Sequence, residues 1–147
     1  MRAAAVQVLA IVFTATVTGF ALASNGPAIV MSGQEHWTAG TGLMKGNRVA
    51  VLAGNPAKSG LFIVRLKLPA GTVFRPHYHA QIEDVTVVSG TLWAGVGDTV
   101  NKAKMTALPA GSFMQIPAGL HHYVMAKIST IIEITAMGPL SLTAVKP

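Results

Sequence analysis

Hydrophobic and polar residues alternate along much of the chain after residue 47, which is the pattern of half-buried β-strands. In the stretch 61–68 the apolar residues fall at every second position and cations lie between them: Phe62, Val64, Leu66 and Leu68 against Arg65 and Lys67. Eight further stretches predict short strands: 48–52, 73–79, 82–88, 91–96, 112–116, 121–127, 130–136 and 140–145. Since no segment shows a helical period, about nine short strands predict an all-β domain, a sandwich or a small barrel.

Glycine and proline mark the turns between these stretches. The segments Pro69-Ala70-Gly71, Ser89-Gly90 and Pro109-Ala110-Gly111 each interrupt the strand pattern. Residues 24–47 are rich in Gly, Ser, Thr and Asn and show no period, so they predict an irregular lead-in. We therefore expect one folded domain over residues 48–147.

The first 23 residues have the organisation of a secretory signal peptide. Arg2 supplies a positive start, residues 3–23 carry no charge, and Ala21 and Ala23 fit the small-residue cleavage pattern. An uncleaved membrane anchor is the alternative, which Gln7 and the several threonines disfavour. Cleavage after residue 23 predicts a periplasmic or secreted protein without stable membrane association.

Composition narrows the range of functions. The chain has 147 residues, the size of one domain. It has no cysteine, which excludes disulfides, thiolate metal sites and thiol catalysis. The net charge is +6, but the cations are scattered, so we expect a solvated basic surface and no nucleic-acid partner. Only five carboxylates are present, which makes the position of each informative.

Three polar residues share one parity in the middle of the chain. An uninterrupted strand would aim His77, His79 and Glu83 at the same side, where two imidazoles and a carboxylate could bind one metal ion. A third imidazole from a later strand would extend this set. The neighbours His121 and His122 point to opposite faces, and the spacing alone does not choose between them. Such a nitrogen and oxygen ligand set suits Fe, Mn, Cu, Ni or Zn.

Two motifs in the same region resemble those of the cupin superfamily. The first is Gly71-x5-His77-x-His79-x3-Glu83-x6-Gly90, and the second is Gly111-x5-Pro117-x-Gly119-x2-His122. Ala126 stands where the family usually has a closing Asn, which is not a metal ligand. The resemblance implies a single-domain jelly-roll β-barrel that holds a divalent transition metal through His77, His79, Glu83 and His122. Within the superfamily, the chain looks most like small exported single-domain cupins.

The resemblance leaves two kinds of function open. One is a metal-dependent enzyme, such as a dioxygenase, that acts on a small oxygenated molecule. The other is a non-catalytic small-molecule or metal-binding and sensing protein. No motif identifies a catalytic acid or base among the candidates Arg75, Tyr78, Gln81, Tyr123 and Glu133. A small-molecule ligand is the expected partner, and pairing of edge strands could form a homodimer.

Overall fold

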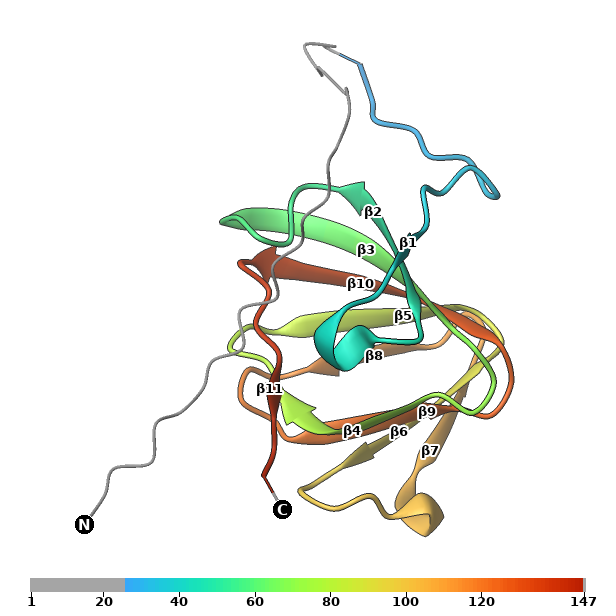
Figure 1. Ribbon diagram of the computed structural model, residues 1–147, viewed down its shortest axis with the longest axis vertical. Helices are drawn as coiled ribbons and strands as arrows, with labels where there is room; N and C mark the ends of the chain where they lie inside the picture. Colours follow the sequence, from blue (N-terminus) through green and yellow to red (C-terminus); the bar gives the residue numbers. More distant parts are fainter. Residues whose placement is uncertain (1–25, 147) are drawn as a thin grey trace, which may run out of the picture.

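A computed structural model describes residues 26–146 (Figure 1). The predicted signal peptide, residues 1–23, lies outside the described residues. The described chain forms eleven strands and two short 3-10 turns: β1 (Thr38–Ala39), η1 (Gly42–Met44), β2 (Arg48–Ala53), β3 (Gly60–Leu68), β4 (Val73–Tyr78), β5 (Glu83–Ser89), β6 (Thr91–Val96), η2 (Lys102–Lys104), β7 (Thr106–Pro109), β8 (Phe113–Ile116), β9 (His122–Ala126), β10 (Thr130–Gly138) and β11 (Thr143–Ala144). None of the helical turns in this range is long and apolar enough to cross a membrane.

The strands form two antiparallel sheets that face each other (Figure 1). One sheet has the order β1-β2-β3-β10-β5-β8, and the other has the order β11-β4-β9-β6-β7. Consecutive strands repeatedly cross from one sheet to the other, as in a jelly roll. The expected all-β jelly-roll fold is confirmed.

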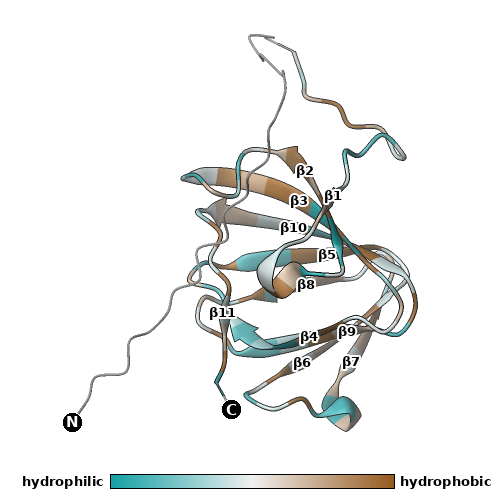
Figure 2. Ribbon diagram, viewed as in Figure 1, coloured by the Kyte–Doolittle hydropathy of each residue, from teal (hydrophilic) through white to brown (hydrophobic). Residues whose placement is uncertain are grey.

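The alternation predicted from the sequence places the core between the sheets. The even-numbered residues of β3 face inward and are nearly inaccessible to solvent: Phe62, Val64, Leu66 and Leu68. Each is paired in the ladder with a residue of β10 or β2 in the same sheet. Phe74, Leu92 and Val124 of the other sheet join them in one hydrophobic cluster. Figure 2 shows that hydrophobic residues concentrate in the strands, whereas the end of β4 is hydrophilic.

Two features of the fold differ from the sequence-based expectation. The pattern predicts no strand between residues 97 and 111, yet Thr106–Pro109 forms β7, which pairs with β6. The lead-in was expected to be irregular, yet Thr38 and Ala39 form β1 on the edge of β2. Both strands are short and depend on a neighbouring strand for their hydrogen bonds, so their own residues carry little periodic signal.

Candidate metal centre

His77, the first histidine of the site, lies near the end of β4 and faces the interior. The ladder between β4 and β9 shifts register between Phe74 and His77, so one extra residue separates two inward-facing side chains. Arg75 and Pro76 occupy this bulge and point away from the core or lie at its margin. His77 is therefore buried between the sheets, directly opposite His122 in the ladder.

His79 and Glu83 reach the same place by a different route from the one the parity argument assumed. No single strand runs through them, because β4 ends at Tyr78 and the chain then crosses to the other sheet. His79 lies in this crossing, and Glu83 is the first residue of β5. The two imidazoles on the β4 side and the carboxylate on the β5 side consequently approach the centre from opposite sheets.

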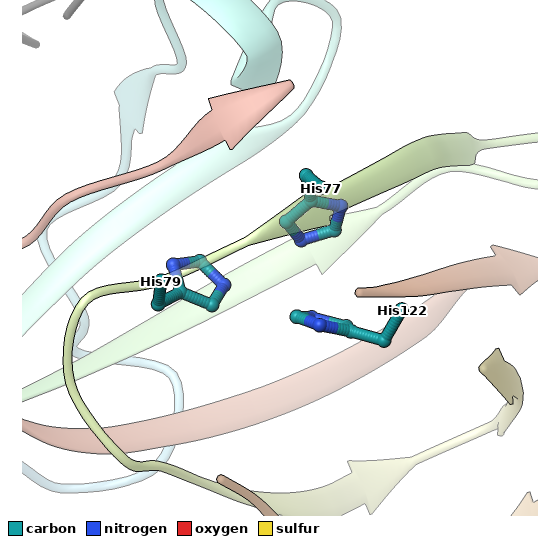
Figure 3. Close-up of side chains that lie close together, drawn as sticks. All are labelled: His77, His79 and His122. Carbon is teal, nitrogen blue, oxygen red and sulfur yellow. The ribbon is translucent and has the colours of Figure 1, made fainter. Parts of the chain in front are cut away.

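Three imidazoles converge in the space between the sheets (Figure 3). One nitrogen from each of His77, His79 and His122 lies within 4.8 Å of the others. The ring centroids of His77 and His122 are 4.3 Å apart, and each lies slightly more than 5 Å from His79. All three residues are at least 94% buried. The structure thus brings together the three histidines that the motifs indicated.

Main-chain carbonyls fix which nitrogen of each ring faces the centre. The Nδ1 of His77 donates to the carbonyl of Arg75 over 2.7 Å, and that of His79 donates to Ser141 over 2.6 Å. The Nδ1 of His122 donates to Leu120 over 3.0 Å. A carbonyl oxygen only accepts hydrogen bonds, so each ring carries its proton on Nδ1 and leaves Nε2 as the free ligand nitrogen.

Glu83 lies beside this group. Its Oε2 is 3.3 Å from Nε2 of His79 and 3.8 Å from Nε2 of His122, and the side chain is buried. The carboxylate therefore adjoins the nitrogens of His79 and His122, and its negative charge suits a divalent cation held by the three histidines. Its role as the fourth ligand stays a prediction.

An observation that is independent of the motifs also indicates that these side chains can bind a metal ion. Nε2 of His79 is buried and has no hydrogen-bond partner in the described part of the chain, although Oε2 of Glu83 lies 3.3 Å away. A buried polar atom without a partner costs about 1–3 kcal/mol. A metal ion bound by this nitrogen would remove that cost.

Burial and mutual charge shape the protonation of the group. Burial lowers the pKa of His77 to about 4, and repulsion from His122 adds to the effect. Burial also lowers the pKa of His122. Burial opposes ionisation of Glu83, but the neighbouring histidines outweigh it and hold the carboxyl pKa below its ordinary value. Glu83 conversely raises the pKa of His79 despite burial. Two neutral imidazoles and an ionised carboxylate are the forms that bind metals.

The space in front of the histidines is a small apolar cavity. Its volume is about 30 Å³. Eleven of its lining residues are hydrophobic: Met44, Leu66, Phe74, Val85, Leu92, Met114, Ile116, Val124, Ile132, Ile134 and Leu142. Since one water needs roughly 10–15 Å³ by this measure, the cavity has room for about two waters.

Two contributors to this site carry no motif. Met44, in η1 of the lead-in, is buried and lines the cavity. Ser141 accepts the His79 hydrogen bond through its carbonyl, and its hydroxyl bonds the side chain of Gln81. The only sequence signal for Met44 is an apolar residue within a polar segment, and Ser141 has none.

The remaining candidates lie outside the cavity. His121 is 38% exposed at its side chain, bonds Asp98 over 2.6 Å and stacks on Tyr78. Glu133 lies on the outer face of β10 and pairs with Arg65. Tyr123 is almost fully buried and packs with Met125 and Met105, away from the three histidines. The structure therefore places His122, and not His121, among the convergent rings.

The fold and the site together define a jelly-roll protein with a three-histidine centre between its sheets. The family model described as Cupin matches residues 44–139, and the chain belongs to the cupin family. This match begins at Met44, the residue of the lead-in that lines the cavity.

Similarity to individual proteins agrees with this membership. A germin-like protein, subfamily 3 member 2, of Arabidopsis thaliana is 34% identical over 67 residues, which are 45% of this chain and 30% of that protein. The chain thus spans under a third of the length of this curated relative.

Solved structures show the same fold. A candidate acetylacetone dioxygenase of Methylibium petroleiphilum has a TM-score of 0.62 at 22% identity, covering 84% of both chains. KdgF of a Halomonas species has a TM-score of 0.60 at 19% identity, covering 77% of this chain and 96% of its own. An RmlC-like cupin of Shewanella frigidimarina has a TM-score of 0.57 at 21% identity, covering 79% and 91%. At these identities the likeness establishes the fold alone.

Proposed function

We propose that this chain is an exported cupin that holds a divalent transition metal through His77, His79, His122 and Glu83. We further propose that the centre acts on a small oxygenated molecule, as a dioxygenase does. One observation carries the proposal: three main-chain carbonyls hold the Nδ1 protons, so that three free Nε2 atoms face one another in a closed space. Within this arrangement the buried Nε2 of His79 has no hydrogen-bond partner among the described residues, which is costly unless a cation binds there.

A divalent metal at this place would supply a Lewis acid with positions left open for the oxygen atoms of a substrate or for O2. The protein's own contribution is orientation and exclusion of water. The carbonyls of Arg75, Ser141 and Leu120 hold the rings in place. The apolar walls keep bulk water away, which strengthens electrostatic interactions inside. Glu83 brings a negative charge that offsets part of the cation's charge.

Related folds support oxygen chemistry as the first candidate. The structure from Methylibium petroleiphilum is described as a candidate acetylacetone dioxygenase, and it covers more of this chain than the other two structures compared. The cupin fold hosts many reactions, so this likeness supports the reaction class and does not identify the substrate.

A second candidate is a protein that binds a metal or a small molecule without catalysis. The small size of the cavity favours it, because about 30 Å³ accepts only a ligand of a few atoms. Apart from the four proposed ligands, the lining offers no ionisable side chain that could act as an acid or base. Sensing or storage of the metal would need neither a large cavity nor such a group.

Export rests on the sequence of residues 1–23, with its charged start, uncharged stretch and Ala21 and Ala23 before the cleavage point. We propose a periplasmic or secreted protein on this ground. N-terminal sequencing of the protein recovered from culture would find Ser24 first. A chain that keeps Met1 in the membrane fraction would contradict cleavage.

The test of function combines metal analysis with oxygen uptake. Protein isolated without added metal is expected to contain one transition metal ion per chain by mass spectrometry of the elements. O2 consumption is then measured with a panel of diols, keto acids and diketones, with His77→Ala as the inactive control. Uptake that depends on a substrate and on His77 supports the enzyme. A metal-loaded protein without uptake on the whole panel would favour the second candidate, and a metal-free protein would contradict the metal centre on which the proposed enzyme depends.

A further inference from the structure

A second concave site lies on the outer surface, apart from the cavity of the histidines. It has a volume of about 560 Å³ and is lined by Trp37, Arg48, Lys67, Pro69, Ala70 and Ser129. We call it the Trp37 groove. It shares no lining residue with the interior cavity. Its size falls in the range of small-molecule sites, roughly 300–1,000 Å³.

Two like charges are placed side by side in this groove. Arg48 of β2 and Lys67 of β3 are direct partners in the antiparallel ladder, and both are exposed. Direct partners point to the same face with their Cβ atoms about 4.5–5.5 Å apart, and like charges in such a pair are destabilising. An anion held between the two side chains would reverse that effect.

No carboxylate side chain of the chain is free to be that anion. All five are engaged elsewhere: Glu35 and Glu133 with Arg65, Glu83 beside His79, Asp84 with Gln115, and Asp98 with His121. In the described part of the chain, neither Arg48 nor Lys67 forms a salt bridge. An anion that pairs with both side chains would therefore come from another molecule.

The groove also offers an anchored aromatic residue. Nη2 of Arg48 donates to the carbonyl of Trp37 over 3.0 Å, which ties this tryptophan to the edge of the sheet. One guanidinium bond is used in this way, and the other donors of the fork remain available to an oxyanion. Pro69 and Ala70 add apolar surface, and Ser129 adds a hydroxyl.

We propose that the Trp37 groove binds an anionic sugar. Its oxyanion lies between Arg48 and Lys67, and its ring covers Trp37. An inorganic anion would fill only a small part of the volume and would leave the indole unused. A nucleic acid would need an extended row of cations along its phosphates, whereas the groove has two. A sugar ring that carries one carboxylate, sulfate or phosphate group and several hydroxyls matches the volume of the groove, its two cations, its tryptophan and its serine hydroxyl.

The two tryptophans make a selective test possible. Trp93 lies under the ammonium of Lys127, 3.5 Å from the ring centroid, and does not line the groove. The full chain is titrated with a trigalacturonate while the two indole N–H signals are followed by NMR, assigned with Trp93→Phe. We expect the Trp37 signal to shift in a saturable way and the Trp93 signal to stay.

Variants distinguish binding by the charges of the groove from non-specific attraction of an anion to a basic protein. Lys67→Gln is expected to weaken binding about tenfold, since it removes a charge-assisted hydrogen bond. Lys102→Gln, an exposed lysine of η2 outside the groove, is the matched control and should retain the wild-type affinity. His77→Ala should also bind normally, so that loss of the metal centre and loss of the groove are distinguishable.

Sugar variants decide the chemistry. Arms with a sulfated and a phosphorylated trisaccharide show which oxyanion is preferred, and saturable binding of any of the three supports the proposal. Equal shifts from neutral maltotriose would overturn it, because the cations would then have no role. Equal affinity for inorganic sulfate alone would show that the sugar ring does not contribute to binding, which would also overturn the proposal. The absence of any shift with all three acidic sugars would overturn it as well.

Discussion

Each of the three buried histidines is held by a single main-chain acceptor. Arg75 and Leu120 lie two residues before His77 and His122, so each of these two facing rings is oriented by an acceptor close to it in sequence. Ser141 orients His79 from a segment 62 residues away. The outcome is that three rings present the same nitrogen, which a set of unconnected core histidines would not be expected to do.

Adjacent histidines allow a matched test of the ligand assignment. His122→Ala is expected to abolish or severely weaken metal occupancy, because it removes one of three convergent nitrogens. His121→Ala should retain the metal, since its ring bonds Asp98 outside the cavity. Metal content after dialysis against a weak chelator measures both. Equal loss in the two variants would contradict the assignment.

Two glycines with the same backbone conformation differ in their surroundings. Gly90 has φ +78°, and an added Cβ would lie 2.6 Å from both Ser129 O and Thr130 Oγ1. Gly111 has φ +87° with nothing within 4 Å. Gly111→Ala is expected to cost about 1–2 kcal/mol from the left-handed backbone alone. Gly90→Ala should cost about 1–3 kcal/mol more from overpacking. Denaturant unfolding measures the loss of unfolding free energy in both variants. Equal losses would contradict the prediction that Gly90→Ala is the more destabilising.

At the scale of elements, the lead-in forms one wall of the proposed site. The 3-10 turn η1 follows β1 and lies across the space between the two sheets (Figure 1). Its Met44 is 4% exposed and joins the core. The side chain of Asn47 donates to the carbonyl of Met44 and accepts from Thr72, which fastens this turn to the connection between β3 and β4. Displacement of η1 would therefore enlarge the cavity for a larger ligand.

Neighbouring residues of η1 test this role. Met44→Ala is expected to cost about 2–5 kcal/mol of unfolding free energy, because it empties space in the core. It should also speed the loss of bound metal to a chelator by widening the cavity. Leu43→Ala, 41% exposed, is the control and should change stability by no more than about 0.5 kcal/mol. If both variants behave alike, η1 does not close the cavity.

Local patterns explain which parts could be predicted from the sequence. The alternation in 61–68 predicted β3, and the motif spacing indicated His77, His79 and His122, because both signals come from residues near in sequence. Met44 and Ser141 could not be found in this way, since their roles depend on contacts with distant segments. The choice between His121 and His122 needed the family motif, and the ladder of β9 with β4 gives its physical reason.

At the scale of the molecule, the centre joins the two sheets. His77 and His122 belong to the sheet with β4 and β9, Glu83 belongs to the other sheet, and His79 lies in the crossing between them. The sheets also meet in the hydrophobic core and through the hydrogen bonds of Thr130 in β10 with Thr91 in β6. A bound metal would thus link groups that separate when the sheets come apart, and it would stabilise the whole fold.

Metal removal should therefore lower the melting temperature of the entire domain in one transition. A ligand at 100 times its dissociation constant adds about 2.7 kcal/mol to the free energy of unfolding. A shift of 1 kcal/mol moves the midpoint by roughly 3–6 °C for a domain of this size, so we expect a difference of roughly 8–16 °C between loaded and metal-free protein. Calorimetry of the wild type, His79→Ala and His121→Ala measures it. His121→Ala should keep the metal-dependent increase, and His79→Ala should lose it while it retains its β-sheet circular dichroism. An equal increase in His79→Ala would mean that the added metal binds elsewhere, and a metal-dependent melting step separate from the main one would mean that the centre does not hold the two sheets together.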